Sequence, residues 1–600
     1  METVAAKDIS QRIKEIGLAI EQLEEEDVAA ARRCRKQLAK IIGREVNGST
    51  DAYIDFENMA GPNPIIGIHA KDITDTLMVM AKQVVKHPQL ALYQSWQLLG
   101  DAVQVLLGNS DLKPSKQDKR FYDPTWHDNP FYKRYMQLYF AWCNRLCEWT
   151  EQVSLEDAEQ RRARFILSLI TEALAPTNTL LNPAAIKRIF ETAGESVQQG
   201  VVNLFDDWLH NGGMPAQVNK RAFSVGENLA TTPGSIVFRN EVLELIQYKP
   251  ITPQVYSKPL FIIPPQINKF YIFDLTPDKS FVHYALSLGI QVFVCSWRNP
   301  NIEHRDWGLE TYIVALEDAI DATCEITGAN NVNVLGACSG GITAATLVGY
   351  LQAVAKSKVN VLTLMVSVLD MNIDSDVALF ATERSLAQAK SYSHRKGVLE
   401  GRDLAKVFAW MRPNDLVWNY WVNNYLLGYP PPAYDVLYWN NDTTRLPAEL
   451  HGQFLDMYEE NPFHHPGLLK ICHEPIDLSQ VECDLYAVAG LNDHITAWEA
   501  CYRSTLLFEG HCDFILSNSG HVQCILNPPG NPKAFYYTNS SHPQRAEEWR
   551  KSAAKHRGSW WEHWAGWIKE RSGEQLQAPK KLGSSLYPPT DIAPGTYVHE

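Results

Sequence analysis

One short stretch, residues 331–346, constrains the fold of this chain more than any other. Its sequence, NVNVLGACSGGITAAT, begins with a β-branched run, passes through a glycine-rich turn and ends in residues that suit the first turns of a helix. The turn carries two neighbouring candidate nucleophiles, the thiol of Cys338 and the hydroxyl of Ser339. A reactive residue between a strand and a helix is therefore the first prediction.

The region around this stretch alternates between strand-like and helical segments. Short apolar runs such as PLFIIPPQ, IQVFVCSW, VLTLMVSVLD, DLYAVAG and DFILSNSG are mostly separated by helical stretches, among them 309–327 and 341–356. This alternation predicts an α/β fold with a mostly parallel sheet covered on both faces. A strand, a G-x-nucleophile-x-G turn and a helix together form the nucleophile elbow of the α/β-hydrolase fold. Residues 372–475, rich in Trp, Tyr, Asn and Pro, interrupt the alternation and predict an inserted cap.

The chain is too long, at 600 residues, for one ordinary core. Helical periodicity dominates the segment before the strand-like runs, so we predict a mainly α-helical N-terminal domain at 56–235 and the catalytic domain at 236–600. Residues 1–55 are predicted to form a charged, helical extension, because the apolar residues between Ile9 and Leu23 follow an a/d pattern. That pattern fits an oligomerisation or docking helix and, equally, a solvated amphipathic arm.

The predicted fold also indicates where the nucleophile's partners lie, because its chain order is nucleophile, acid, base. Asp493 follows the run LYAVAG, and His521 follows the next run, DFILSNSG. Taken singly, the first would also fit a turn-forming residue and the second a capping histidine. Together with Cys338 they predict a triad in which His521 deprotonates the thiol, while Asp493 orients the imidazole and stabilises its charge.

The glycines of the turn favour sulfur over oxygen as the nucleophile. Cys338 is flanked by Gly336 and Gly340, whereas a frame centred on Ser339 would place Ala337 in the crowded position before the turn. A thiol that accepts an acyl group from a thioester exchanges bonds of similar energy, so the acyl-enzyme stays activated for a second transfer. A cysteine elbow therefore predicts acyl transfer from a thioester such as an acyl-CoA.

Two backbone amides are expected to stabilise the oxyanion. One is the N–H of Ser339, and the other comes from the loop PPQIN after the first core strand. Pro265 has no N–H, so Ile267 or its neighbour is the candidate. His494, beside the predicted acid, would either support the triad or simply form a turn.

Composition excludes several other classes of function. The net charge of −14 argues against general nucleic-acid binding. The N-terminus lacks an apolar signal segment, and no stretch approaches 18 apolar residues, which predicts a cytoplasmic protein without a transmembrane segment and with reduced thiols. Cys143 and Cys147 lack a second ligand pair, so no metal site is predicted. Tryptophan clusters at 418–425 and 559–567 fit core packing or a surface that meets something apolar.

Longer motifs then occur in a fixed order along the chain. They include HNGGMPAQVN, PPQINKFYIFDLTP, SWRNP, LGACSGG, RPNDLVWNYWVNNYLLG, NDHITAW and SGHVQCILNPP. In these motifs the chain resembles polyhydroxyalkanoate synthases from about residue 60 to its C-terminus. GACSGG and PPQINKFY are most similar to class II members, which use medium-chain (R)-3-hydroxyacyl-CoA and work without a second type of subunit.

The resemblance implies a mechanism and further site residues. Cys338 would take the acyl group from CoA, and the 3-hydroxyl of that unit, activated by His521, would attack another thioester. No cofactor is implied, because CoA is the leaving group of the substrate. Arg412, in MRPNDLVWNY, would meet the CoA phosphates or a substrate channel, or form an ordinary salt bridge of the cap. Asp274 and Trp439 also fall in family motifs, with structural roles as the default expectation.

The resemblance further implies a homodimer attached to polyester granules, in contact with granule-associated proteins. Residues 1–55 have no counterpart in class II enzymes, which leaves oligomeric state and granule attachment open. Two other functions stay as alternatives. A thioesterase or intracellular polyester depolymerase would use the same fold, although serine is the natural nucleophile of a hydrolase. A non-catalytic granule-coating protein would not need the three triad residues in order.

Overall fold

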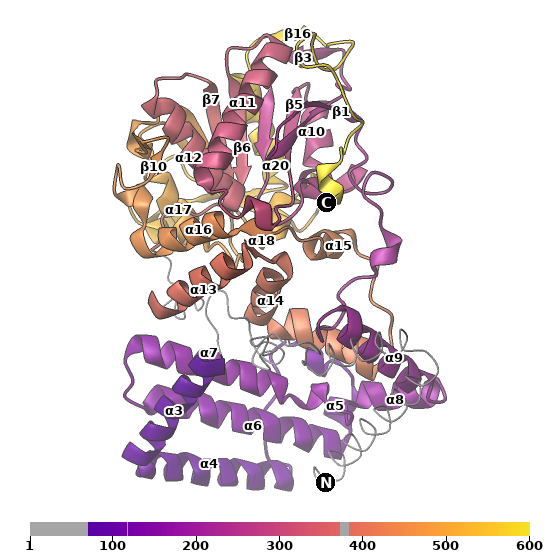
Figure 1. Ribbon diagram of the computed structural model, residues 1–600. Coiled ribbons are helices and arrows are strands. Elements are labelled where there is room, and N and C mark those ends of the chain that lie inside the picture. The colour runs from indigo at the N-terminus through magenta and orange to yellow at the C-terminus, as the bar shows by residue number, and fades with distance from the viewer. Residues whose placement is uncertain (1–69, 117, 373–382) are drawn as a thin grey trace, which may run out of the picture. The chain divides into compact units, whose positions relative to one another are not determined.

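The computed structural model describes residues 70–116, 118–372 and 383–600 of the chain (Figure 1). The predicted extension at 1–55, with its heptad-like pattern, lies outside the described residues. Among the helices of the described part, none combines the length and the apolar character needed to cross a membrane.

The N-terminal part of the described chain is helical. Asparagine caps help to start these helices: the side chain of Asn129 accepts hydrogen bonds from the amides of Phe131 and Tyr132, and Pro130 occupies the first helical position. This region confirms the helical segment predicted ahead of the sheet. Its α-helices are α3 (Ala70–Lys86), α4 (Pro88–Leu107), α5 (Thr125–Asp128), α6 (Pro130–Gln152), α7 (Asp157–Ala173), α8 (Pro183–Glu191) and α9 (Glu195–His210).

A ten-stranded sheet follows, in the order β1-β2-β5-β4-β6-β7-β12-β13-β14-β15. Its centre, from β5 to β13, is parallel, while β1, β2, β14 and β15 pair antiparallel at the two edges. This arrangement confirms the predicted α/β-hydrolase fold. The strands are β1 (Gly234–Arg239), β2 (Leu243–Tyr248), β4 (Leu260–Ile263), β5 (Val292–Trp297), β6 (Val332–Ala337), β7 (Val359–Met365), β12 (Asp484–Gly490), β13 (Cys512–Ser517), β14 (Phe535–Thr538) and β15 (Ala554–Arg557).

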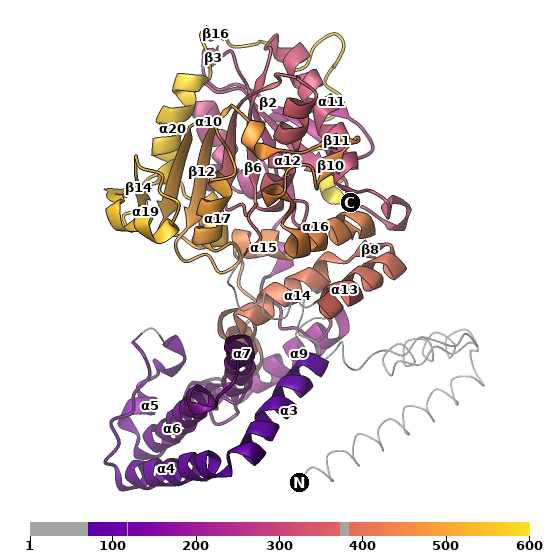
Figure 2. The same ribbon diagram turned by 90° about the vertical axis from the view of Figure 1, so that its left-hand side faces the viewer.

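Helices cover both faces of this sheet, as Figure 2 shows: α11 (Leu309–Thr327) and α12 (Ser339–Ala353) lie on one side, α10 (Phe281–Ser287) and α20 (Trp560–Arg571) on the other. The sheet has a hydrophobic core on each face. Strand β6 contributes to both cores, because successive side chains of a strand point to opposite faces. Val334 packs in the same cluster as residues of α11 and α12, whereas Leu335 packs with α10 and α20. All six residues of β6 are buried, as expected for a central parallel strand.

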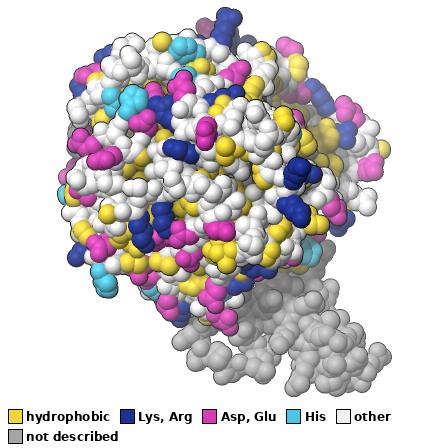
Figure 3. Space-filling view, turned by 90° about the horizontal axis from the view of Figure 1, so that it is seen from above, with side chains coloured by type: hydrophobic (Ala, Val, Ile, Leu, Met, Phe, Trp, Pro, Cys, Tyr) yellow, Lys and Arg dark blue, Asp and Glu magenta, His cyan; other side chains and the backbone are white. Residues whose placement is uncertain are grey.

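The tryptophans of α20 belong to this core. Trp560, Trp561 and Trp564 are at most 1% exposed, and the indole N–H of Trp560 donates to the carbonyl oxygen of Cys524 at 2.8 Å. Core packing is therefore the correct interpretation of the cluster at 559–567. On the outer face drawn in Figure 3, acidic and basic side chains are interspersed with hydrophobic ones.

The cap lies between β7 and β12, two strands that are neighbours in the sheet. An insertion after β7 starts at the edge where the parallel strands finish, which is where this fold carries its active site. Its elements are α13 (Glu383–Lys396), β8 (Val398–Leu399), α14 (Gly401–Met411), the π-helical turns η9 (Asn414–Trp418) and η10 (Trp421–Leu426), α15 (Asp435–Asn441), β9 (Leu446–Pro447), α16 (Ala448–Glu460), β10 (Lys470–Ile471) and β11 (Glu474–Pro475).

The aromatic cluster at 418–425 joins the cap to the N-terminal helices. The hydroxyl of Tyr425 donates to Asp207 of α9 at 2.8 Å, and the indole N–H of Trp421 donates to the carbonyl oxygen of Asn178 at 3.1 Å. The side-chain amide of Asn203 donates to the carbonyl oxygen of Asn424 at 2.9 Å. These aromatic residues therefore contact protein rather than an outer apolar surface.

Candidate active site

The turn between β6 and α12 has the geometry of a nucleophile elbow at Cys338. This residue has φ 51° and ψ −123°, a left-handed conformation that is unfavourable for a side chain with a Cβ atom. Ser339 is instead the first residue of α12. The backbone strain lies on the sulfur-bearing residue, as the glycine frame predicted.

The flanking glycines allow the strand and helix to approach. A Cβ atom on Gly336 would lie 2.6 Å from the Cβ of Ala344, and one on Gly340 would meet the carbonyl oxygens of Ile263 and Pro264. Carbonyl oxygens of a central strand cannot move aside without breaking the sheet. Close packing at both flanks therefore holds Cys338 in its strained conformation.

The predicted acid and base lie together at the same edge of the sheet. Asp493 follows β12, and His521 begins α18 (His521–Ile525) after β13. The Nδ1 atom of His521 lies 2.7 Å from Oδ2 of Asp493. The carboxylate also accepts the amides of Ile495 at 2.8 Å and Thr496 at 3.0 Å. Burial alone would raise the pKa of Asp493, but His521 and these donors outweigh it and lower that pKa.

Cys338 completes the constellation through His521. Burial opposes a charge on the imidazole, yet the negative charges of Asp493 and Cys338, and hydrogen bonds to both, raise the pKa of His521 well above its usual value. Because Nδ1 is used by Asp493, Nε2 is the ring nitrogen left to serve the sulfur. The structure thus brings together all three residues that the sequence predicted as a triad.

The loop that carries one predicted oxyanion donor packs against the elbow that carries the other. The amide of Gln266 donates to the hydroxyl of Ser339 at 3.2 Å, which brings the PPQIN loop against the elbow. Within residues 70–600, apart from the gaps noted above, the structure gives no acceptor for the backbone amide of either Ser339 or Ile267. Both amides are thus available to a ligand.

His494 and Arg412 lie within electrostatic range of the triad. Burial and the charge of Arg412 lower the pKa of His494, while the charge of Asp493 partly opposes them. Arg412 also pairs with Asp415 at 2.5 Å, with both side chains about half exposed. Arg412 therefore forms the salt bridge that one prediction expected. Its effect on His494 also places it near the site, as a contact with the CoA phosphates or a substrate channel would require.

Asp274 and Trp439 are both buried but contact different parts of the structure. Asp274 is buried and accepts hydrogen bonds from the hydroxyls of Thr232 at 2.5 Å and Ser280 at 2.7 Å. These contacts organise the loop around it. Burial raises its pKa, which those hydrogen bonds partly offset. Trp439 is buried too, but its indole N–H donates to the carbonyl oxygen of Lys269 at 2.8 Å, at the end of the PPQIN loop.

Sequence reasoning missed two residues near the triad. The hydroxyl of Thr496 donates to Oδ2 of Asp493 at 2.7 Å and lies 3.1 Å from Nδ1 of His521. Its place three residues after the acid, in NDHIT, was a usable signal. Desolvation and the charge of Cys338 raise the pKa of Tyr458 in the cap helix α16, although this residue is 40% exposed. Nothing in the sequence around Tyr458 indicated that the charge of Cys338 would act on it.

Comparison with known proteins agrees with this geometry. Residues 117–285 match the family model described as the N-terminus of poly-beta-hydroxybutyrate polymerase (PhaC), and residues 259–528 match the alpha/beta hydrolase fold. The chain is 54% identical over 544 residues to poly(3-hydroxyalkanoate) polymerase 1 of Ectopseudomonas oleovorans, covering 91% of this chain and 97% of that protein. The chain belongs to the poly(3-hydroxyalkanoate) polymerase family.

Other poly(3-hydroxyalkanoate) polymerases are also similar along most of their length. Poly(3-hydroxyalkanoate) polymerase 2 of the same organism is 51% identical, over 89% of this chain and 96% of its own. The polymerase subunit PhaC of Cupriavidus necator is 35% identical, over 84% and 85%. Higher identity to the Ectopseudomonas pair agrees with the class II resemblance of the GACSGG and PPQINKFY motifs.

Proposed function

We propose that this chain polymerises (R)-3-hydroxyacyl groups from CoA thioesters, of medium chain length, into a polyester with release of CoA. The observation that carries the proposal is the positive φ of Cys338 between Gly336 and Gly340, beside the His521–Asp493 pair. A strained cysteine served by a histidine can accept an acyl group and pass it on. The polymerase names of relatives more than 50% identical supply the product class.

The first half-reaction loads the enzyme. His521 takes the proton of the Cys338 thiol, and the thiolate attacks the thioester carbonyl carbon of the substrate. The negative oxygen that forms is stabilised by the amides of Ser339 and Ile267. When the C–S bond to CoA breaks, the CoA sulfur takes the proton from His521. One thioester is exchanged for another, so the acyl group remains activated.

The second half-reaction lengthens the chain. His521 takes the proton of a 3-hydroxyl, whose oxygen attacks the carbonyl carbon of another thioester. An ester bond forms, a C–S bond breaks, and the released sulfur takes the proton back. Asp493 stabilises the imidazolium present during each transfer. An oxygen nucleophile in place of Cys338 would hold the chain as a stable ester, which favours hydrolysis.

The remaining roles concern binding and location. Arg412 is proposed to bind the CoA phosphates, since a guanidinium suits phosphate geometry. No resident cofactor is proposed, because CoA enters as part of the substrate. We also propose a homodimer that works in the cytoplasm at the polyester granule surface, together with granule-associated proteins. The resemblance to class II enzymes supports these assignments.

The test uses purified wild type and Cys338→Ala with (R)-3-hydroxyoctanoyl-CoA. CoA release and insoluble polyester are measured together. Polymer from the wild type and neither signal from the variant is the expected result. Release of CoA with only soluble hydroxy acid would identify a hydrolase, and polymer from Cys338→Ala would show that another residue is the nucleophile.

A further inference from the structure

Three successive peptide groups of the PPQIN loop are held by hydrogen bonds. The amide of Gln266 donates to the hydroxyl of Ser339 at 3.2 Å. The carbonyl oxygen of Gln266 accepts the hydroxyl of Thr444, and the carbonyl oxygen of Ile267 accepts the amide of Thr444 at 3.0 Å. Thr444 belongs to the cap, between α15 and β9, and is 4% exposed. The loop is therefore held from the elbow on one side and from the cap on the other.

The contact with Thr444 determines the direction of the Ile267 amide. A trans peptide is planar, so the carbonyl of Gln266 and the N–H of Ile267 point in opposite directions. Because the hydroxyl of Thr444 binds that carbonyl, the N–H is turned away from Thr444. The Ser339 hydroxyl fixes the preceding peptide in the same way, so the Ile267 amide has little freedom to rotate.

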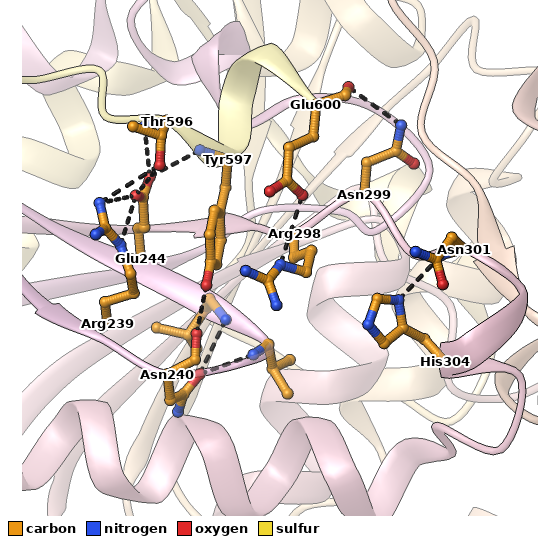
Figure 4. A network of polar contacts seen from close by, with 12 residues as sticks. Arg239, Asn240, Glu244, Arg298, Asn299, Asn301, His304, Thr596, Tyr597 and Glu600 are labelled. Atoms are coloured by element: carbon orange, nitrogen blue, oxygen red, sulfur yellow. Dashed lines mark hydrogen bonds and ion pairs between the residues drawn. The ribbon is translucent and has the colours of Figure 1, made fainter.

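Other contacts anchor the same loop to the cap and, through Glu600, to the residues that follow the neighbouring strand β5. Asn268 forms an antiparallel bridge with Thr443, and the indole N–H of Trp439 donates to the carbonyl oxygen of Lys269. The ammonium group of Lys269 donates to a main-chain oxygen of Glu600 at 3.0 Å. Figure 4 shows that Glu600 is itself held by Arg298 and Asn299, which follow β5. The loop is thus rigid on both sides of Ile267.

We infer that Thr444 and Ser339 are positioning residues that aim the Ile267 amide at the oxyanion, so that the cap takes part in building the oxyanion hole. This rests on the proposed function, in which Cys338 attacks a thioester. It also assigns a second role to Ser339, whose hydroxyl holds the loop while its own amide donates to the oxyanion. The thiol and His521 do not depend on either hydroxyl.

The experiment separates the oxyanion hole from the nucleophile. Thr444→Val removes the hydroxyl at nearly constant volume, and Thr444→Ser restores it. Thr323→Val is the matched control, because it removes a buried hydroxyl that donates to the carbonyl oxygen of Ala319 within α11. Each protein is assayed for CoA release from (R)-3-hydroxyoctanoyl-CoA. Each is also tested for inhibition by an alkyl trifluoromethyl ketone, whose adduct with a thiol carries an oxyanion, and for alkylation of Cys338 by iodoacetamide, which forms none.

Removing one oxyanion donor costs about 10²–10³-fold in kcat, and a misaimed donor should cost less. We expect Thr444→Val to lower kcat about 10-fold or more and to weaken inhibition by the ketone by a similar factor. KM and the rate of Cys338 alkylation should stay nearly unchanged. Thr444→Ser should recover most of both losses, and Thr323→Val should resemble the wild type. Ser339→Ala should show the same pattern as Thr444→Val.

Two results would overturn the inference. In one, Thr444→Val keeps wild-type kcat and ketone affinity. In the other, alkylation of Cys338 slows as much as acylation does, which would show that Thr444 supports the whole site rather than one amide. Failure of the proposed function is distinct, because the wild type would then release CoA with only soluble hydroxy acid, or Cys338→Ala would still make polymer.

Discussion

The imidazole of His521 and the carboxylate of Asp493 form a buried pair, with Nδ1 and Oδ2 2.7 Å apart and the carboxylate side chain fully shielded from solvent. Removal of either charge leaves the other buried and unpaired, which is more costly than the pair itself. This relationship makes both activity and stability depend on pH in a defined direction.

Asp493→Asn tests that pair. The raised pKa of His521 means that its contribution is full below its ordinary value of 6.5 and is lost as pH rises through the folded-state pKa. The lowered pKa of Asp493 means that its contribution is present above 3.8 and is lost as pH falls through the folded-state pKa. The variant should therefore lose most stability between about pH 3.8 and pH 6.5, where both contributions are complete, as measured by urea unfolding across pH.

The kcat of Asp493→Asn should fall by more than its loss of stability can explain. An asparagine can leave the imidazole in the wrong tautomer, which costs about 10⁴-fold in kcat in comparable triads. A loss of CoA release below 10-fold at neutral pH, in a variant that is fully folded, would contradict the assigned role.

Gly340→Ala tests the crowding at the elbow. The new Cβ would meet the carbonyl oxygens of Ile263 and Pro264, so we expect a loss of about 1–3 kcal/mol in the free energy of unfolding. Gly566→Ala is the matched control: this helical glycine of α20 has no atom within 4 Å of the new Cβ and should gain about 0.5–1 kcal/mol. Chemical denaturation measures the free energy of unfolding of both variants. Equal changes in the two would contradict the prediction that Gly340 is crowded.

His451 predicts acid sensitivity of the cap. Burial lowers the pKa of His451 to about 4, and its Nδ1 atom lies 3.0 Å from the hydroxyl of Ser393. Because the unfolded chain binds the proton more readily, stability present at pH 7 is lost as pH falls from 6.5 toward 4. His451→Gln should lessen the loss between pH 7 and pH 5 by about 2 kcal/mol. The exposed His465→Gln is the control, and equal pH profiles of the two variants would contradict the prediction.

Tyr425→Phe tests the joint between the cap and the N-terminal helices. The phenol donates to the buried carboxyl of Asp207, whose pKa is already raised by burial. Loss of this donor should cost about 1–3 kcal/mol. Tyr434→Phe, at a residue that is 62% exposed, should change stability by less than about 0.5 kcal/mol. Thermal unfolding of both variants provides the comparison.

The sequence predicted the triad because local rules place each member. The glycine spacing marks Cys338, and Asp493 and His521 each follow a strand whose end is set by the sheet. Thr444 and Tyr458 could not be predicted in this way, since their contacts depend on how the cap packs. Thr444 lies between α15 and β9, where neither a strand alternation nor a helical period fixes which side chains face inward. Arg412 shows the intermediate case, where a motif suggested proximity but gave no partner.

The hydrogen bond between Tyr425 and Asp207 links α9 to a cap whose Thr444 holds the oxyanion loop. The N-terminal helices thus support the cap that reaches the PPQIN loop, although none of them supplies a triad residue.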